Sequence, residues 1–278
     1  MALLCIDRGR EFMRFIHISD THLGKTPAFS YNGFNSYRHL EQVIETVNRL
    51  PFAVDFVLHS GDVTEYGSSE EYALARKLME RLRFPVKYAV GNHDNGALLQ
   101  NALIGIESPS GRYDHAFTAD GVQVIVLDTN NGFVPNGTLT ERQLADLRAR
   151  CTPEGAPLII VLHHPPLPLD TPWLAEGWAS FDFRSMLLDE GEAFRAAIAP
   201  ARERLRGVFF GHVHRAFQVQ RDGILYCSAP STVIQFTAYP EQRDPKPAPD
   251  EPPAFALVTL SDSQLTIRQY ALSRPEQA

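Results

Sequence analysis

"HISDTHLGK", residues 17–25, contains the step from an apolar run into a polar loop. The run begins at Arg14 and reads RFIHIS to residue 19, a short β-branched segment of the kind that forms a buried strand. Asp20 and His22 follow two positions apart, so an extended backbone would direct both side chains toward one point. One such pair does not define a site, and its meaning depends on what the other strands carry at their ends.

Two further apolar runs, residues 54–60 (VDFVLHS) and 85–91 (PVKYAVG), are also typical of buried strands and also end in polar residues. Between the first two runs, residues 35–50 carry apolar side chains at helical spacing, and residues 68–83 repeat that pattern. The order strand, helix, strand, helix, strand predicts a parallel sheet with right-handed crossovers.

The second half of the chain adds hairpins to this pattern. Asp-Gly pairs at 120–121 and 222–223 lie between strand-like runs and predict two hairpin turns. Residues 255–260 and 265–272 predict a closing hairpin at the C-terminal end. The other expected elements are helices at 139–150 and 192–205 and strands at 157–163 and 206–211.

These elements predict a single α/β domain over residues 14–278, preceded by an extension at 1–13. Residues 165–190 are rich in aromatic side chains and are expected to cap the substrate site or to cover a partner subunit, with Trp173 as a candidate for the pocket wall. Residues 239–254 combine proline with charge, which is typical of a surface connector.

Composition narrows the class of protein. The formal net charge is −7 and no run of Lys or Arg stands out, which argues against a protein that binds a nucleic-acid polymer. The three cysteines lie far apart, which is typical of a reduced compartment, and we expect the cytoplasm. No stretch approaches the ~18 apolar residues of a membrane span. An anionic substrate would need local positive charge, and a metal ion is one compact source of it.

Polar motifs follow five of the expected strands: SDTH (19–22), SGDVTE (60–65), GNHD (91–94), LHHPP (162–166) and GHVH (211–214). Because the carboxyl ends of parallel strands meet at one edge of a sheet, we expect these loops to converge. Mixed imidazole and carboxylate donors suit Mn, Fe or Zn, whereas oxygen-only sites suit Mg or Ca. The side chains expected to surround the site are Asp20, His22, Asp62, Asn92, His163, His212 and His214.

Seven donors are too many for one tetrahedral ion and about right for two ions that share a carboxylate. Asp62 stands midway through the series of motifs and is the natural bridge. Two metals ~3.5–4 Å apart can clamp the attacking and leaving oxygens of a displacement at phosphorus, and they can acidify a bound water into a nucleophile. The donor set therefore predicts phosphoryl chemistry.

The motifs D-x-H, G-D-x-x-E, G-N-H-D, H-H and G-H-x-H, in this order, resemble those of the calcineurin-like metallophosphoesterase superfamily. SAPSTVIQF (228–236) and HHPPLP (163–168) are similar to the branch of class III cyclic nucleotide phosphodiesterases and glycerophosphodiesterases. The resemblance implies a four-layer α/β/β/α sandwich of two mixed β-sheets flanked by helices. It also implies a homodimer or larger homo-oligomer, with the aromatic segment 173–183 and the C-terminal hairpin as contact surfaces.

Carried over position by position, the resemblance implies that His93 is not a ligand, and that it contacts the phosphate and stabilises or protonates the leaving oxygen. A histidine with a pKa near neutrality suits that task. Four further residues are candidates for orienting His93 or the ligands: Glu65, Asp94, Asp128 and His164. The implied ligands are Asp20, His22, Asp62 and His214 for one metal, and Asp62, Asn92, His163 and His212 for the other.

We expect a metal-dependent phosphodiesterase that hydrolyses small phosphodiesters, 3′,5′-cyclic nucleotides first, by attack of a hydroxide that bridges the two ions. The alternatives are a glycerophosphodiesterase, a nucleotide phosphomonoesterase or pyrophosphatase, and a protein-binding scaffold without activity. The complete set of donors argues against the scaffold. Four other histidines are expected to be structural: His17 and His59 within strands, His39 on a helix and His115 in a hairpin.

Overall fold

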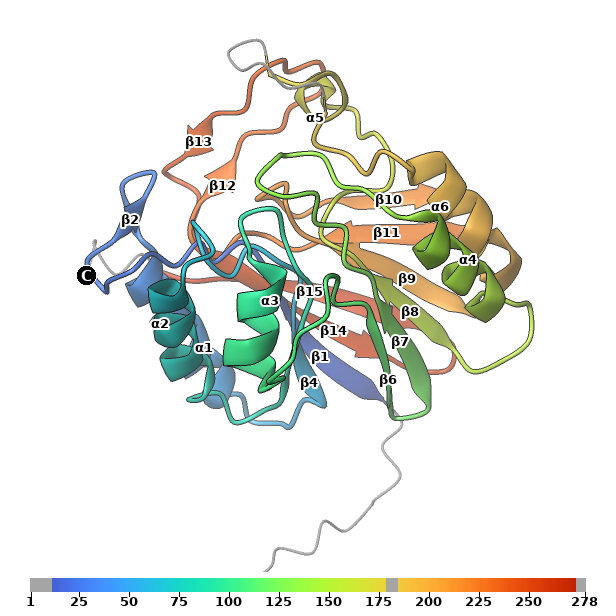
Figure 1. Cartoon of the computed structure of the whole chain (residues 1–278), viewed down its shortest axis with the longest axis horizontal. Helices are drawn as coiled ribbons and strands as arrows, with labels where there is room; N and C mark the ends of the chain where they lie inside the picture. The colour runs from blue at the N-terminus through green and yellow to red at the C-terminus, as the bar shows by residue number, and fades with distance from the viewer. Residues whose placement is uncertain (1–11, 179–184, 274–278) are drawn as a thin grey trace, which may run out of the picture.

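Two β-sheets lie face to face in the computed structural model, which describes residues 12–178 and 185–273 (Figure 1). The first sheet has the order β15-β14-β1-β4-β5, in which the pairs β1–β4 and β4–β5 are parallel and the pairs with β14 are antiparallel. Its strands are β1 (Met13–Ile18), β4 (Phe56–His59), β5 (Val86–Tyr88), β14 (Ala254–Leu260) and β15 (Leu265–Ala271).

The second sheet has the order β10-β11-β9-β8-β7-β6 and is parallel at its centre, with an antiparallel pair at each edge. Both edge hairpins turn at the predicted Asp-Gly pairs, where both residues have positive φ, as a type I′ turn requires. The strands are β6 (His115–Ala119), β7 (Val122–Val126), β8 (Leu158–Val161), β9 (Leu205–Phe210), β10 (Gln218–Arg221) and β11 (Ile224–Ser228).

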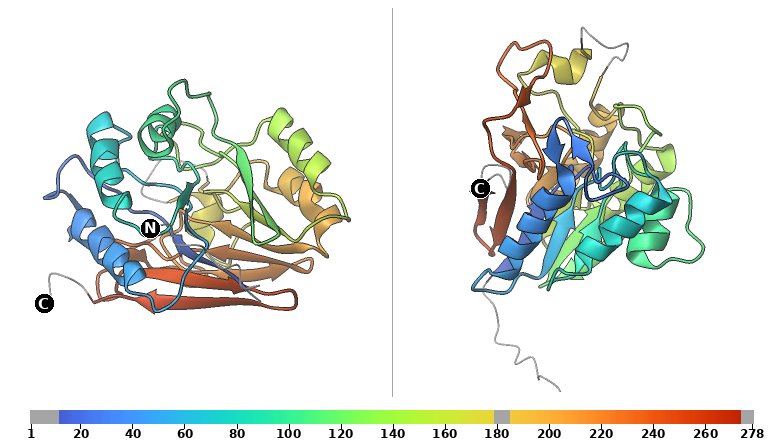
Figure 2. Two further views of the ribbon diagram at one scale, coloured as in Figure 1. Left: turned by 90° about the horizontal axis from the view of Figure 1, so that it is seen from below. Right: turned by 90° about the vertical axis from the view of Figure 1, so that its left-hand side faces the viewer.

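Helices cover the outer face of each sheet, α1 and α2 over the first and α4 and α6 over the second (Figure 2). Residues Ser68 and Glu71 form a capping box that fixes the start of α2. The helical segments are α1 (Ser36–Asn48), α2 (Ser69–Met79), α3 (Gly96–Leu99), a π-helical turn (Gln100–Ile104), α4 (Glu141–Arg150), α5 (Pro172–Glu176), α6 (Gly191–Ile198) and a 3-10 turn (Ala199–Ala201). Two small ribbons complete the fold: β2 (Ser30–Tyr31) with β3 (Phe34–Asn35), and β12 (Gln235–Phe236) with β13 (Pro247–Ala248).

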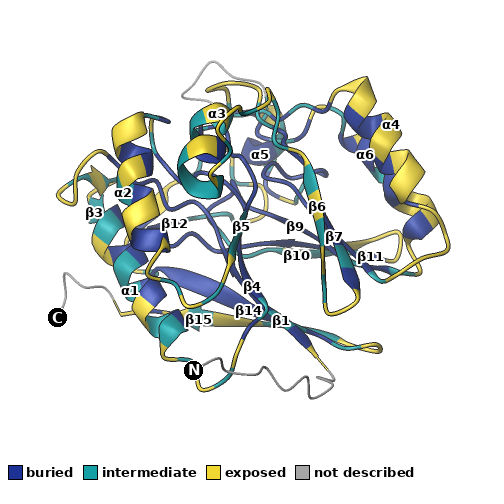
Figure 3. Ribbon diagram, turned by 60° about the horizontal axis from the view of Figure 1, so that its bottom comes forward, coloured by how far each residue is buried: buried dark blue, intermediate teal, exposed yellow. Residues whose placement is uncertain are grey.

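Three hydrophobic clusters hold the layers together. The middle cluster lies between the sheets, where Phe15 stacks on Phe56 at 5.0 Å and meets the edge of Phe209 at 5.2 Å. The other two clusters join each sheet to its helices. Figure 3 shows buried strands between helices whose outer faces are exposed. The predicted α/β/β/α sandwich of two mixed sheets is therefore confirmed.

Several predicted boundaries were wrong; for example, the helix predicted over 68–83 ends at Met79. The helix predicted over 192–205 ends at Ile198, because Pro200 cannot continue the backbone hydrogen bonds of a helix interior, and β9 already begins at Leu205. β1 begins one residue before the predicted domain start, since Met13 is buried and pairs with Leu260.

Residues 239–254 are tied to the rest of the protein more closely than their composition suggests. β13 pairs with β12, and the backbone N–H groups of Glu241 and Trp173 donate to the carbonyls of Asp170 and Gln242 respectively. The predicted extension over 1–13 and segment over 165–190 fall partly outside the described residues. Within the parts of the chain that are described, no helix has the length and apolar character needed to cross a membrane.

Candidate metal centre

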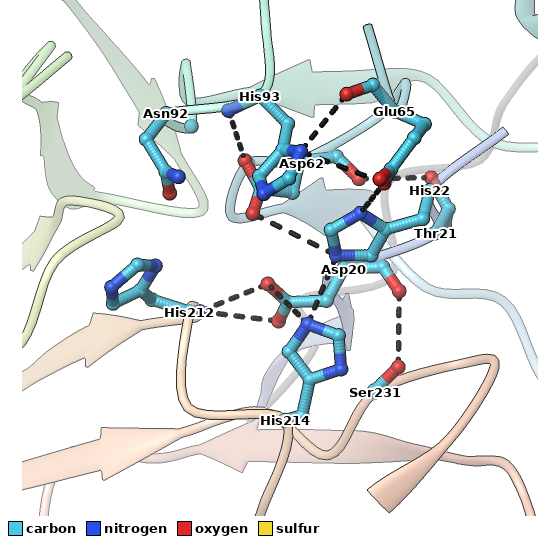
Figure 4. Close-up of polar contacts among 12 residues, drawn as sticks. Asp20, Thr21, His22, Asp62, Glu65, Asn92, His93, His212, His214 and Ser231 are labelled. Atoms are coloured by element: carbon cyan, nitrogen blue, oxygen red, sulfur yellow. Dashed lines mark hydrogen bonds and ion pairs between the residues drawn. The ribbon is translucent and has the colours of Figure 1, made fainter. Parts of the chain in front are cut away.

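The five motifs meet in one buried cluster, although they come from both sheets. Figure 4 shows residues of four of them, the motifs of Asp20, Asp62, Asn92 and His212. Backbone hydrogen bonds join neighbouring loops: Asp20 N donates to the carbonyl of Gly61, and Gly211 N donates to that of His163. The carboxylate of Asp20 also accepts a hydrogen bond from the backbone N–H of His212 at 3.0 Å. The loops after β1, β4, β8 and β9 are therefore held as one unit.

Ring nitrogens face one another across the centre of this cluster. His22 Nε2 lies 2.9 Å from His214 Nε2, and His163 Nε2 lies 3.2 Å from His212 Nδ1. Asp62 Oδ2 lies between these pairs, 3.7 Å from His22 Nε2 and 3.3 Å from His163 Nε2. One carboxylate thus contacts both halves of the site.

All seven predicted donors are brought together and all are buried. Asn92 joins through its Oδ1, which is 3.2 Å from His163 Nε2. Four groups of side chains have donor atoms within 4.8 Å of one another: Asp20, His22 and His214; His22, Asp62 and His93; Asp20, Asp62 and His163; and His163, His164 and His212.

The tautomers of three histidines show that the residues fit a cation. The Nδ1 atoms of His22, His214 and His163 face acceptors, namely the Glu65 carboxylate and the carbonyls of Ile234 and Ser60. Each Nδ1 therefore carries a proton, and each Nε2, once it is free of its own proton, turns a lone pair inward. Facing lone pairs repel one another unless a positive charge lies between them.

The ionisation of the cluster agrees with this reading. Burial lowers the pKa of His22 to about 3 and holds the pKa values of His212 and His214 well below their usual range, so these rings are neutral. Burial also raises the pKa of Asp20 to about 7. Although burial opposes it, the Asp62 carboxylate raises the pKa of His163 to about 9, so the cluster attracts positive charge at that point.

Five of the donor residues have a left-handed backbone, which corrects the expectation of extended loops. Their φ angles are 55° at Asp20, 41° at His22, 55° at Asp62, 71° at His212 and 49° at His214. Such angles cost on the order of 1–3 kcal/mol in a residue with a side chain. The bends follow β1, β4 and β9, and the side chains of all five residues join the cluster.

Two glycines leave room for the donors. A Cβ atom on Gly61 would lie 2.8 Å from Cγ of His163, and one on Gly91 would lie 2.9 Å from Cγ of Asp62, with other atoms of both side chains closer still. Real Cβ atoms essentially never approach heavy atoms within 3.0 Å. The glycines of the SGD and GNHD motifs therefore allow the backbone to pack directly against the donors.

His93 lies at the exposed side of the cluster, with 31% of its side chain accessible. Its Nδ1 faces the Glu65 carbonyl at 2.9 Å, and its backbone N–H donates to Asp62 Oδ1 at 2.9 Å. Although burial alone would lower it, the carboxylates of Asp62 and Glu65 raise the pKa of His93 above its ordinary value. Because Nδ1 is engaged, Nε2 is the atom that can give a proton to a substrate.

Glu65 joins His93 to the cluster, as its carboxylate lies 2.7 Å from His22 Nδ1 and 3.5 Å from His93 Nδ1. Burial raises the pKa of Glu65 to about 7. Asp94 has a different role: its carboxylate accepts hydrogen bonds from the backbone N–H groups of Val63, Thr64 and Gly91 and from the hydroxyl of Tyr72, which fixes two donor loops together.

Asp128 contacts the donor loop only through a second residue, Asn130. Its carboxylate accepts hydrogen bonds from the backbone N–H groups of Tyr113 and Asn130, and the Asn130 amide donates to the carbonyls of Gly91 and Asp94. His164 Nδ1 contacts Thr129 Oγ1 at 2.7 Å. Within the described residues, the Nε2 atoms of His164 and His212 are buried without a hydrogen-bond partner. Both atoms therefore remain available to contact a metal ion.

Aromatic rings beside the donors were not predicted. Tyr31, from the β2–β3 ribbon, stacks on His22 at 4.2 Å, and Phe236 stacks on His214 at 4.8 Å. Phe236 ends the quoted motif SAPSTVIQF, but Tyr31 lies in a segment without a recognisable pattern. The Ser231 hydroxyl of the same motif donates to the Asp20 carbonyl at 3.0 Å.

Trp173, predicted as part of the pocket wall, belongs to a hydrophobic core cluster. Its side chain is 1% exposed and packs in the cluster between the second sheet and its helices, with its ring edge against Trp178 at 6.3 Å. Two of the histidines expected to be structural are hydrogen-bonded within the fold: His17 to the Ser60 hydroxyl and His59 to the Thr21 hydroxyl.

The two-sheet sandwich with His and Asp at its strand ends defines the class of metallophosphoesterases, and comparison with known proteins agrees. The model of the calcineurin-like phosphoesterase family matches residues 13–216. This chain therefore belongs to the calcineurin-like phosphoesterase family. Its structure also resembles the purple acid phosphatase PPD1 of yellow lupin, with a TM-score of 0.59 at 16% identity over 94% of this chain and 51% of that one, which supports the fold.

Curated relatives are similar over most of their length. The chain is 30% identical to the 3′,5′-cyclic adenosine monophosphate phosphodiesterase CpdA of Pseudomonas aeruginosa over 223 residues, covering 80% of this chain and 76% of that protein. It is 28% identical to the glycerophosphodiester phosphodiesterase GpdQ of Enterobacter lignolyticus over 253 residues, covering 88% and 86%. The family and these relatives confirm the predicted class of enzyme, a phosphoric diester hydrolase.

Proposed function

We propose that this protein is a dinuclear metal-dependent phosphodiesterase that hydrolyses small phosphodiesters, with 3′,5′-cyclic nucleotides as its substrates. The observation that carries the proposal is the convergence of seven buried donors into two halves that share Asp62. The mixture of neutral imidazoles and carboxylates favours Mn, Fe or Zn. In this proposal Asp20, His22, Asp62 and His214 hold one ion, and Asp62, Asn92, His163 and His212 hold the other.

When bound, the two ions supply positive charge for the phosphate oxygens and lower the pKa of a water molecule that attacks phosphorus. The protein supplies the geometry. Asp62 fixes the loop of His93 through the backbone N–H of that residue. His93 then presents Nε2 at the exposed side of the site, where it protonates the leaving oxygen. Glu65 keeps the rings of His22 and His93 in their orientation.

Two observations support a small cyclic nucleotide as the substrate. The similarity to CpdA proteins extends over about four-fifths of the chain. A net charge of −7 disfavours a long polyanion, which would meet repulsion outside the site itself. The similarity to GpdQ covers slightly more of the chain and makes a glycerophosphodiester the second candidate.

The mechanism is tested with His93→Ala and Asn92→Ala, assayed on bis-p-nitrophenyl phosphate with added Mn. We expect both variants to lose two or more orders of magnitude in kcat, in line with the loss of a general acid or a metal ligand. His115→Ala, which changes a partly buried histidine of β6 outside the cluster, serves as the matched control and should keep its turnover. Turnover like that of the wild type in both active-site variants would refute the assignment.

A parallel assay separates the candidate substrates. Rates on 3′,5′-cyclic AMP, on a glycerophosphodiester and on a phosphomonoester are compared at equal enzyme and Mn concentrations. A higher kcat/KM on the monoester than on either diester would show that the protein is a phosphomonoesterase instead. A higher kcat/KM on the glycerophosphodiester than on 3′,5′-cyclic AMP would support the proposed diesterase activity and make the glycerophosphodiester its substrate.

A further inference from the structure

Two large aromatic side chains are exposed beside the loop of His93. Tyr66 is 60% exposed and Phe133 is 62% exposed. Single exposed aromatic residues are common on protein surfaces, so exposure alone assigns them no role. Their positions are more informative, because the two residues come from different parts of the chain and both lie next to the exposed side of the metal centre.

Tyr66 directly follows Glu65, the residue that contacts both His22 and His93. The backbone of Tyr66 is fixed, since its N–H donates to Glu71 Oε2 at 3.1 Å. Its ring meets the edge of Phe29 with 6.3 Å between the ring centroids. Tyr66 is therefore held in place at one edge while most of the ring is open to solvent.

Phe133 reaches the same region from the loop after β7. Asn130 ties that loop to the donor loop through its hydrogen bonds to Gly91 and Asp94. The tip of the Phe133 ring lies beside Gly67, where an added Cβ atom would be 3.2 Å from Phe133 Cζ and 3.0 Å from the backbone nitrogen of Asn95. Both positions are two residues along the chain from Glu65 and His93 respectively.

We propose that Tyr66 and Phe133 form an aromatic rim that stacks on the nucleobase of the substrate and selects nucleoside diesters over aliphatic ones. The inference rests on the proposed function, because it takes the phosphodiester to be bound with its leaving oxygen toward His93. A planar base has a π-face for these rings, whereas a glycerol or choline group has none. The rim would raise the affinity for nucleotides without touching the reacting atoms.

The test replaces each ring with an aliphatic side chain, in Tyr66→Leu and Phe133→Leu. We expect each variant to lose about tenfold in kcat/KM on 3′,5′-cyclic AMP, mainly through KM, because stacking of a base on one ring has about that strength. The same variants should stay within about twofold of the wild type on glycerophosphocholine. Phe12→Leu, which removes a 36% exposed ring at the start of β1, is the matched control and should change neither rate.

A binding measurement separates this inference from the proposed function. Titration calorimetry with AMP and with ribose 5-phosphate should give about tenfold tighter binding of AMP, and each rim variant should reduce that difference. This result would support the rim even if the wild type hydrolysed neither diester, in which case the proposed function alone would fail. Equal affinity for both ligands, or equal losses on the two diesters in the rim variants, would refute the rim whatever the turnover of the wild type.

Discussion

Gly91→Ala is expected to disable the enzyme through a single methyl group. Gly91 has an ordinary φ angle, so alanine brings no backbone strain, and the effect depends on space alone. The new Cβ would overlap the carboxylate and the backbone nitrogen of Asp62. The nitrogen belongs to the main chain and the carboxylate to a short side chain. Neither can move aside as the end of a long flexible side chain can.

The size of the effect follows from the displacement. To reach an ordinary contact distance, Asp62 or the loop of Gly91 must retreat on the order of 1 Å, and a misplacement of that size costs about 10²-fold in rate. Overpacking also costs about 1–3 kcal/mol of stability, which a domain of this size can lose without unfolding. We therefore expect folded protein with about 10²-fold lower kcat/KM and weaker retention of metal.

The assay combines thermal unfolding, metal content after dialysis and steady-state hydrolysis of a diester with added Mn. Gly111→Ala is the matched control, because a Cβ there meets nothing within 4 Å and φ is ordinary. That variant should keep full activity and gain a few tenths of a kcal/mol to about 1 kcal/mol of stability. Gly91→Ala with the kcat/KM and metal content of the wild type would refute the argument that Asp62 requires this space.

Three further predictions concern single side chains. Asp20→Ala should lose one metal equivalent more readily than the other on titration with a chelator, since Asp20 is assigned to one ion only; simultaneous loss of both would contradict that assignment. Glu65→Gln should weaken the affinity for the ion held by His22 about 10–100-fold in metal-binding titrations, because it removes the carboxylate that orients the His22 ring. Unchanged affinity would show that Glu65 does not orient His22. Burial lowers the pKa of His115 from 6.5 to about 4, so the folded state resists its protonation and loses stability as the pH falls from 6.5 toward 4. His115→Phe should abolish about 2 kcal/mol of that loss in urea unfolding at several pH values, and an unchanged pH dependence would show that His115 is not its source.

The succession of strands and helices along the chain was predictable because it depends on local signals. The Asp-Gly pairs at 120–121 and 222–223 set two hairpin turns, and both adopt the expected positive φ angles. The polar residues after each apolar run were sufficient to identify side chains that the structure brings together, since parallel strands end at one edge. The match of five motifs made the joint prediction much stronger than any one pair of residues.

Features that depend on distant contacts were not predictable. Asp20 and His22 gave no sign of a left-handed backbone, because bends of this kind are stabilised by other loops, such as the hydrogen bonds from Thr21 and His22 to the Asp62 carbonyl. The almost complete burial of Trp173 in the core cluster of the second sheet was not evident from the composition of its segment. The positions of Tyr31 and Phe133 likewise depend on how their loops fold back.

The left-handed bends lower the stability of the fold in exchange for side chains that can hold metal. They occur at Asp20, His22, Asp62, His212 and His214. Glycine would adopt each bend without steric cost, yet glycine has no donor atom. A gene copy released from selection for catalysis could therefore become more stable by losing these side chains first. Relatives with glycine at these bends are expected to be more stable proteins that no longer hydrolyse esters, and heat resistance would then mark the loss of activity during evolution.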